Sequence, residues 1–231
     1  MATRSETEPA RPAARLYLVA PPADDPSVLA RDLDLALGEG DGTVAAALLR
    51  LPDAEEWALI RYVAAIAPAL QRKGIAVLLD GHAELVARTG VDGAHLTGIA
   101  AFSAAVGSLK PERIAGAGGL ATRHDAMLAA EGGADYVMFG EPASGAGDSE
   151  SHRAGSHRPP FAAVVERIAW WAEVFQPPCV GHAESLDEAV ALAAAGADFV
   201  ALGSFVFTDS RGLPANIRAA AERLSASEAV K

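Results

Sequence analysis

Apolar positions along the chain fall into two kinds of segment that alternate from residue 16 to about residue 224. Short continuous apolar runs are typical of buried strands, and the longer stretches between them repeat their apolar residues every three or four positions, which is typical of amphipathic helices. The short runs predict strands at 16–20, 43–49, 76–79, 93–96, 113–117, 136–139, 179–181 and 199–202. The longer stretches predict helices at 26–37, 53–71, 82–89, 99–109, 122–131, 161–175, 185–195 and 214–224.

This alternation of strands and helices predicts a parallel sheet, because parallel strands need a crossover connection. Eight units favour closure into a single-domain (β/α)8 TIM barrel over residues 16–226, and an open doubly wound sheet is the alternative. Residues 1–15 hold charges of both signs and prolines without an apolar run, so a flexible tail is expected rather than a signal peptide. Residues 143–160 are polar and rich in glycine and serine. They predict a mobile loop after the sixth strand, either a lid or an insertion without a role.

One short pattern occurs three times, each time directly before a predicted strand. A glycine is followed two positions later by an aspartate, which gives Asp92, Asp135 and Asp198. Glycine is the residue that most easily ends a helix in the left-handed region, and aspartate bonds to nearby backbone amides in turns. The three aspartates are therefore interpreted as structural, at the N-terminal face of the barrel, where stability rather than chemistry is expected.

Charge and composition narrow the range of partners. Acidic residues outnumber basic ones by 30 to 19, and the formal charge of −11 would repel nucleic acid and anionic lipid alike. No apolar run reaches the ~20 residues of a membrane span. The single cysteine, Cys179, excludes an intrachain disulfide, is interpreted as core packing, and fits a cytoplasmic protein. A phosphorylated small molecule stays compatible with this surface, and the sequence leaves open whether the chain forms a homo-oligomer.

Five blocks carry a more specific signal. Gly90–Leu96 is close to a known Gly-X-Asp-Gly-Val-His-Leu element, and Gly133–Gly140 matches Gly-Ala-Asp-Tyr-X-X-Phe-Gly. Ala195–Ser204 is similar to a phosphate-binding strand and loop, while Ala47–Arg50 and Val77–Gly81 stand in place of Gln-Leu-Arg and Ile-Asn-Asp elements. In this order, from residue 16 to about residue 224, the blocks resemble the thiamine phosphate synthase and thiazole tautomerase superfamily. The resemblance implies the barrel fold, although shared scaffold does not fix function.

The resemblance also implies a transferase of thiamine biosynthesis. Members of this family couple a pyrimidine pyrophosphate to a thiazole phosphate with Mg²⁺ and expel pyrophosphate, whose growing negative charge must be met by cations, metal and amide donors. By resemblance, Arg50 would contact pyrophosphate and Asp80 would be the metal-binding carboxylate. The residues that would hold phosphate are Gly181, Gly203 and Ser204, and those that would line the substrate pocket are Thr97, Gly118 and Gly140.

Several positions depart from the family pattern. The glutamine of the second strand is Leu48, the Asn-Asp pair is read as Asp80-Gly81, and the second carboxylate falls on Ala100. The serine after the fifth strand is Gly118, the lid lysine has no match in 143–160, and the Gly-Gly pair after the seventh strand is His182-Ala183. These departures predict weak or altered synthase activity and cast doubt on Mg²⁺ binding. They also make His182 a candidate catalytic residue.

Several interpretations stay open at this point. Asp80 fits a ligand role or a helix cap, and His95 fits a hydrogen-bonded core histidine better than a catalyst. Four charged or titratable residues of the predicted loop could close over an anion or belong to a charged flexible loop without a role: Arg153, Arg158, His152 and His157. The chain is either synthase-like or an accessory protein, regulatory protein or isomerase that binds a phosphorylated ligand on the same barrel. A purely structural role is a third reading.

Overall fold

The computed structural model describes residues 12–38, 42–142 and 158–228. Its strands are β1 (Arg15–Ala20), β2 (Val44–Leu49), β3 (Ala76–Asp80), β4 (Gly93–Thr97), β5 (Ile114–Gly118), β6 (Tyr136–Phe139), β7 (Cys179–Ala183) and β8 (Phe199–Leu202). Its helices are α1 (Pro26–Ala36), α2 (Glu56–Arg72), α3 (Ala83–Thr89), α4 (Ile99–Leu109), α5 (Arg123–Glu131), α6 (Phe161–Val174), α7 (Leu186–Ala194), α8 (Phe205–Thr208) and α9 (Leu213–Glu228).

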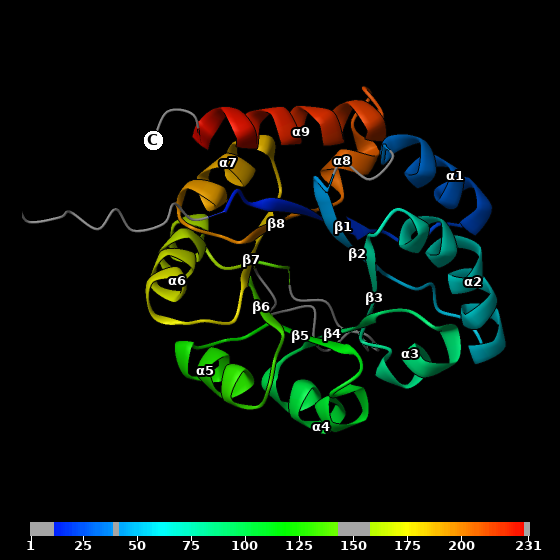
Figure 1. The fold of residues 1–231 in the computed structure, drawn as a ribbon, viewed down its shortest axis with the longest axis horizontal. Helices are drawn as coiled ribbons and strands as arrows, with labels where there is room; N and C mark the ends of the chain where they lie inside the picture. Colours follow the sequence, from blue (N-terminus) through cyan, green and yellow to red (C-terminus); the bar gives the residue numbers. More distant parts are fainter. Residues whose placement is uncertain (1–11, 39–41, 143–157, 229–231) are drawn as a thin grey trace, which may run out of the picture.

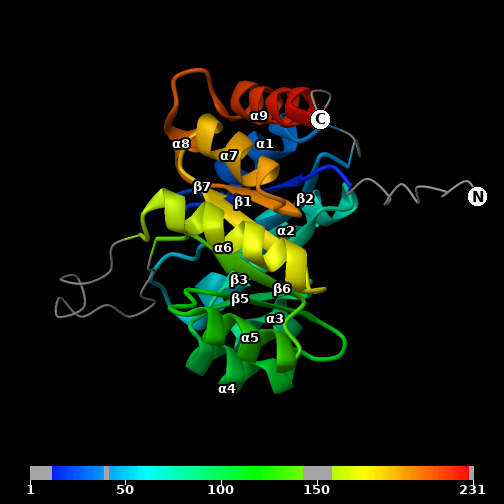
Figure 2. The ribbon, with the colours of Figure 1, turned by 90° about the vertical axis from the view of Figure 1, so that its left-hand side faces the viewer.

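The eight strands form a closed parallel barrel in sequence order, with β8 pairing back onto β1. Figure 1 shows the helices ringed around the strands, and Figure 2 shows α9 beside α1 and α7, against which it packs. This arrangement confirms the predicted TIM barrel and excludes the open sheet. Strand alternation sends successive side chains to opposite faces. In β1, for example, Leu16 and Leu18 pack beneath the helices, whereas Tyr17 and Val19 point into the barrel interior.

The three glycine–aspartate repeats make the same contact in the structure. The carboxylate of Asp92 accepts a hydrogen bond from the N–H of Val77 at 2.8 Å, and Asp135 does the same for Ala115 at 2.8 Å. Asp198 accepts from the N–H of Cys179 at 2.8 Å. Each aspartate lies just before one strand and ties it to the start of the preceding strand. The structural interpretation of the repeats, at the N-terminal face, agrees with these contacts.

The element boundaries differ from the prediction in two informative places. Helix α2 begins at Glu56, so the predicted start at residue 53 was wrong; its N-cap, Glu55, makes no side-chain capping bond. Helix α8 was missed, because four residues are too few to produce a helical period. The predicted starts of the helices at 122 and 185 are close to those observed. Thr122 and Ser185 are the N-caps of α5 and α7, and each side chain accepts a hydrogen bond from a backbone N–H of the first helical turn.

Candidate active site

The candidate site residues lie at the C-terminal ends of the strands. Asp80, Thr97 and Gly118 are the last residues of their strands, and His182 is the second-last residue of β7. Arg50 and Gly140 directly follow β2 and β6, while Gly203 and Ser204 follow β8. Because all eight strands run parallel in one closed barrel, these positions share a single rim. In barrels of this kind that rim carries the chemistry.

Arg50 and Asp80 form an ion pair across the ends of β2 and β3. The Arg50 Nε atom donates to Asp80 Oδ2 at 3.1 Å, and the side chains are 30% and 15% exposed. Asp80 is not the cap of α3, because the N-cap is His82, which makes no side-chain capping bond. The carboxylate of Asp80 therefore lies at the rim beside a guanidinium, which neutralises its charge there.

A chain of polar side chains crosses the barrel interior below this pair. The hydroxyls of Tyr17 and Tyr136 are 2.9 Å apart, and the Tyr136 hydroxyl lies 2.9 Å from His95 Nδ1. His95 Nε2 is in turn 2.9 Å from Glu141 Oε2. His95 is fully buried, as expected for a hydrogen-bonded core histidine, and its ring stacks on that of Tyr136. Both ring nitrogens of His95 thus have protein partners.

The sequence reasoning did not single out Tyr17, Tyr136 or Glu141. The sequence did hold a signal for Glu141. This charged residue follows a buried strand and Gly140, and a residue in that position lies at the rim of the barrel. The tyrosines gave a weaker signal, since alternation places them on the inward face of their strands but does not say that they meet.

His95 and Glu141 stabilise each other's charged forms. Burial alone would lower the pKa of His95, but the adjacent Glu141 carboxylate outweighs it and raises that pKa. Burial alone would raise the pKa of Glu141, and the attraction of His95 outweighs it in the other direction. Desolvation raises the pKa of Tyr17 and of Tyr136, so both hydroxyls stay protonated. The interior therefore holds a coupled His95–Glu141 pair, in which each group favours the charged form of the other, with two neutral phenols behind it.

Among the described residues, two buried polar atoms beside this pair lack a partner at hydrogen-bond geometry, Glu141 Oε1 and His182 Nδ1. The backbone of Gly119 lies close enough to the Glu141 carboxylate to help lower its pKa. His182 is 3% exposed, and desolvation lowers its pKa to about 4, so the imidazole is neutral near pH 7. Gly118 borders the same space. A Cβ atom at Gly118 would clash with Glu141 Oε1 and His95 Nε2, so a larger residue there would force these side chains to shift.

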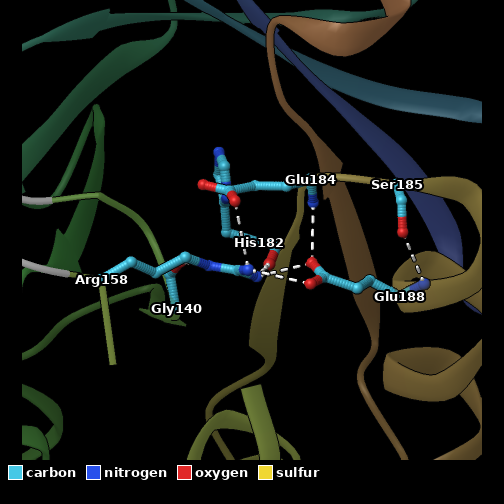
Figure 3. A network of polar contacts seen from close by, with 6 residues as sticks. All are labelled: Gly140, Arg158, His182, Glu184, Ser185 and Glu188. Atoms are coloured by element: carbon cyan, nitrogen blue, oxygen red, sulfur yellow. Dashed lines mark hydrogen bonds and ion pairs between the residues drawn. The ribbon is translucent and has the colours of Figure 1, made fainter. Parts of the chain in front are cut away.

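Arg158 braces the rim between β6 and β7 (Figure 3). Its guanidinium donates to the carbonyls of Gly140 at 2.8 Å and His182 at 2.7 Å, and it makes two bonds to Glu188, at 3.0 and 2.7 Å. Glu184 adds a weaker ion pair at 3.4 Å. The predicted loop at 143–160 lies outside the described residues as far as residue 157, whereas Arg158 is fixed in place. In this structure the Arg158 guanidinium is engaged by two backbone carbonyls and by Glu188. Arg153, His152 and His157 lie outside the described residues.

The glycines of the candidate set face different surroundings. A Cβ at Gly181 would meet Leu192 of α7 at 3.1 Å, and one at Gly140 would meet Val164 of α6 at 2.7 Å, so both glycines permit close packing against helices. A Cβ at Gly203 would lie 3.0 Å from His182 Cε1, which places Gly203 at the site. Ser204 is exposed and stands at the N-cap of α8 without a side-chain capping bond.

The Mg²⁺ that the resemblance implies fits poorly with the donors at this rim. The described residues include no cluster of three His, Cys, Asp or Glu side chains that could hold a metal ion. Asp80 is the one rim carboxylate at an implied metal position, and it is already paired with Arg50. Mg²⁺ is usually held by one or two carboxylates together with waters and substrate phosphates. At the implied metal positions the described residues offer one carboxylate, Asp80, and Arg50 competes with a metal ion for it.

Comparison with known proteins decides the family. The sequence profile described as thiamine monophosphate synthase matches residues 16–206. The chain belongs to this family. It is 36% identical to a thiamine-phosphate synthase of Rhodospirillum centenum over 203 residues, covering 86% of this chain and 91% of that protein. It is 34% identical to the thiamine-phosphate synthase of Hyphomonas neptunium over 222 residues, covering 93% and 96% of the two chains.

Solved structures agree on the fold of this family member. A thiamine phosphate pyrophosphorylase from Pyrococcus furiosus superposes with a TM-score of 0.70 at 16% identity, covering 92% of this chain and 96% of the other. A 3-hexulose-6-phosphate synthase from Salmonella typhimurium superposes with a TM-score of 0.64 at 14% identity, covering 92% and 99%. At such low identity these likenesses show the barrel alone. Within the described residues, none of the helices combines the length and the apolar run that crossing a bilayer requires.

Proposed function

We propose that this chain is a thiamine-phosphate synthase-like barrel that binds a phosphorylated small molecule at its C-terminal rim and whose coupling activity is weak or altered. The observation that carries the proposal is the Arg50–Asp80 ion pair at the rim of a family barrel. A guanidinium there supplies the positive charge that pyrophosphate needs. The carboxylate that would hold Mg²⁺ is engaged by the same guanidinium, and the second family carboxylate is Ala100. Leaving-group stabilisation is therefore reduced.

The phosphate site is proposed at the turn after β8. The N–H of Gly203 donates to the carbonyl of Ala183 at 3.1 Å, so the donors for an anion would be the N–H groups that follow, beginning with Ser204. The neutral His182 ring lies against Gly203 and could add a further bond. Backbone amides after the last strands form the usual phosphate site of these barrels.

A thermal-shift titration tests this site. Inorganic pyrophosphate and a thiazole phosphate should stabilise the fold by about RT ln(1 + [L]/Kd). The Ser204→Asp variant places a negative charge beside the amides and should abolish the shift. Ser225→Asp, on an exposed face of α9, is the matched control and should keep it. An equal shift in the Ser204→Asp protein would remove this turn as the phosphate site.

A second candidate is an isomerase, or an accessory or regulatory protein, on the same barrel. The observation in its favour is the buried His95–Glu141 pair, which offers groups for proton transfer without a metal. Binding of a phosphorylated ligand without coupling of the two family substrates would favour this candidate over the synthase.

A further inference from the structure

Helix α8 directly follows the turn after β8, and it is too short to hold itself in place. It has four residues, and a single helical turn is not stable without contacts to the rest of a fold. In Figures 1 and 2 it lies beside α9, against which it packs. The position of α8 therefore depends on what α9 and the core provide.

Asn216 of α9 supplies a hydrogen bond that α8 cannot make for itself. The Val206 side chain is fully buried in the core, but its carbonyl has no backbone donor among the described residues, because the helix ends at Thr208. The Asn216 Nδ2 group donates to this carbonyl at 3.0 Å, and Asn216 is 1% exposed. Asn216 itself is held in the first turn of α9, where its N–H donates to the carbonyl of Gly212 at 3.2 Å.

The Asn216 amide is used on its donor side. Among the described residues its Oδ1 atom has no hydrogen-bond partner, although buried polar atoms are usually paired. Arg211 and, to a smaller extent, the Asn216 amide lower the pKa of Asp209, which directly follows α8. A leucine of similar size would fill the same space without an unpaired oxygen, so what the amide contributes here is its N–H donors.

The other end of α8 carries the donors of the proposed phosphate site. The N–H groups of Ser204 and Phe205 have no acceptor among the described residues. The carbonyl of Ser204 accepts from the N–H groups of Phe207 at 3.0 Å and Thr208 at 3.2 Å, so the turn is tied to α8. His182, whose Nδ1 lacks a partner among the described residues, lies beside the same turn. A shift of α8 would carry the two free donors with it.

We propose that Asn216 is a positioning residue for the phosphate turn: it holds the Val206 carbonyl and thereby α8, and α8 sets the direction of the free N–H donors. Asn216 acts through α8 and does not contact the anion in this role. The inference deepens the proposed function and rests on it in taking the turn after β8 as the phosphate site. The measured affinity for an anion should fall with the fraction of molecules in which α8 is in place.

Isothermal titration calorimetry of the full chain with inorganic pyrophosphate tests the proposal, because it measures the dissociation constant separately from stability. Asn216→Leu keeps the size of the side chain and removes the donor to Val206. Its dissociation constant should rise roughly 5- to 100-fold, the factor that corresponds to one buried group left unpaired. Asp92→Ala is the matched control. It also leaves one backbone group unpaired, the N–H of Val77, but at the opposite end of the barrel, and it should keep the wild-type constant.

Hydrogen exchange of the backbone amides reports on α8 without any ligand. Exchange in α8 should be faster in Asn216→Leu and unchanged in Asp92→Ala. Wild-type pyrophosphate affinity in Asn216→Leu, or an equal loss of affinity in both variants, would overturn the positioning role. If the wild-type protein binds no pyrophosphate, the phosphate site of the proposed function fails, and faster exchange in Asn216→Leu would leave Asn216 only as an anchor of α8.

Discussion

Removal of the Arg158 guanidinium should destabilise the barrel more than removal of any exposed arginine. The side chain is 14% exposed, it bonds to two backbone carbonyls, and it pairs with Glu188, which is 21% exposed. Breaking a buried pair from one side costs about 3–5 kcal/mol, and an exposed pair is worth about 0–1 kcal/mol. Partial exposure of both partners places the expected cost of Arg158→Ala at about 2–4 kcal/mol. At about 2–4 °C per kcal/mol for a chain of this size, Tm should fall by roughly 4–16 °C.

Urea denaturation followed by circular dichroism measures this loss. The midpoint should fall while the m-value stays the same, since the surface exposed on unfolding is unchanged. Arg223→Ala is the matched control: Arg223 pairs with Asp187 on the neighbouring helices, and the two side chains are 45% and 85% exposed. The control should lose less than about 1 kcal/mol. If Arg158→Ala loses no more than Arg223→Ala, the assignment of Arg158 as a brace is wrong.

Two further predictions concern pH and the repeated aspartates. Burial lowers the pKa of His182 from an ordinary 6.5 to about 4. Between these pH values the unfolded chain therefore binds more protons than the folded chain. The free energy of unfolding should fall as the pH drops from 6.5 to 4, by up to about 3 kcal/mol. His182→Asn should flatten this part of the stability–pH curve, and an identical slope in the variant would contradict the burial argument. Asp92→Ala leaves the N–H of Val77 without its acceptor and should lower the free energy of unfolding in urea by about 1–3 kcal/mol. Asp92→Asn keeps a side-chain oxygen and should lower it less. Equal losses in the two variants would refute the structural role of the Asp92 carboxylate.

The barrel was predictable because its signal is local. Each strand–helix unit shows its own apolar period, and once eight parallel strands are assigned, closure brings the ends of all strands to one rim. The same pattern places Arg50, Asp80 and His182 at one end of the molecule from the sequence alone. It also gave the aspartate repeats a structural meaning, because their turn chemistry depends on a few neighbouring residues.

The interior of the site was not predictable, because its contacts join residues that are far apart in sequence. Tyr17 and Tyr136 are separated by 119 positions, and His95 and Glu141 by 46. Which inward-facing side chains meet depends on the register of the strands and on the space left by Gly118. The local spacing of apolar residues determines neither the register nor that space. Arg158 was weighed as an anion-binding residue because charge is visible in the sequence, whereas its backbone acceptors are not.

Synthase turnover by the purified full chain tests the central claim most directly. The protein is given the pyrimidine pyrophosphate, the thiazole phosphate and Mg²⁺, and product is measured beside wild-type Rhodospirillum centenum thiamine-phosphate synthase. Loss of one stabilising contact to a developing charge commonly lowers a rate by about 10²–10³-fold, and several are altered here. The predicted result is turnover reduced by at least that factor, with phosphate-ligand binding retained. Turnover equal to that of the reference enzyme, abolished by Arg50→Ala, would contradict the account.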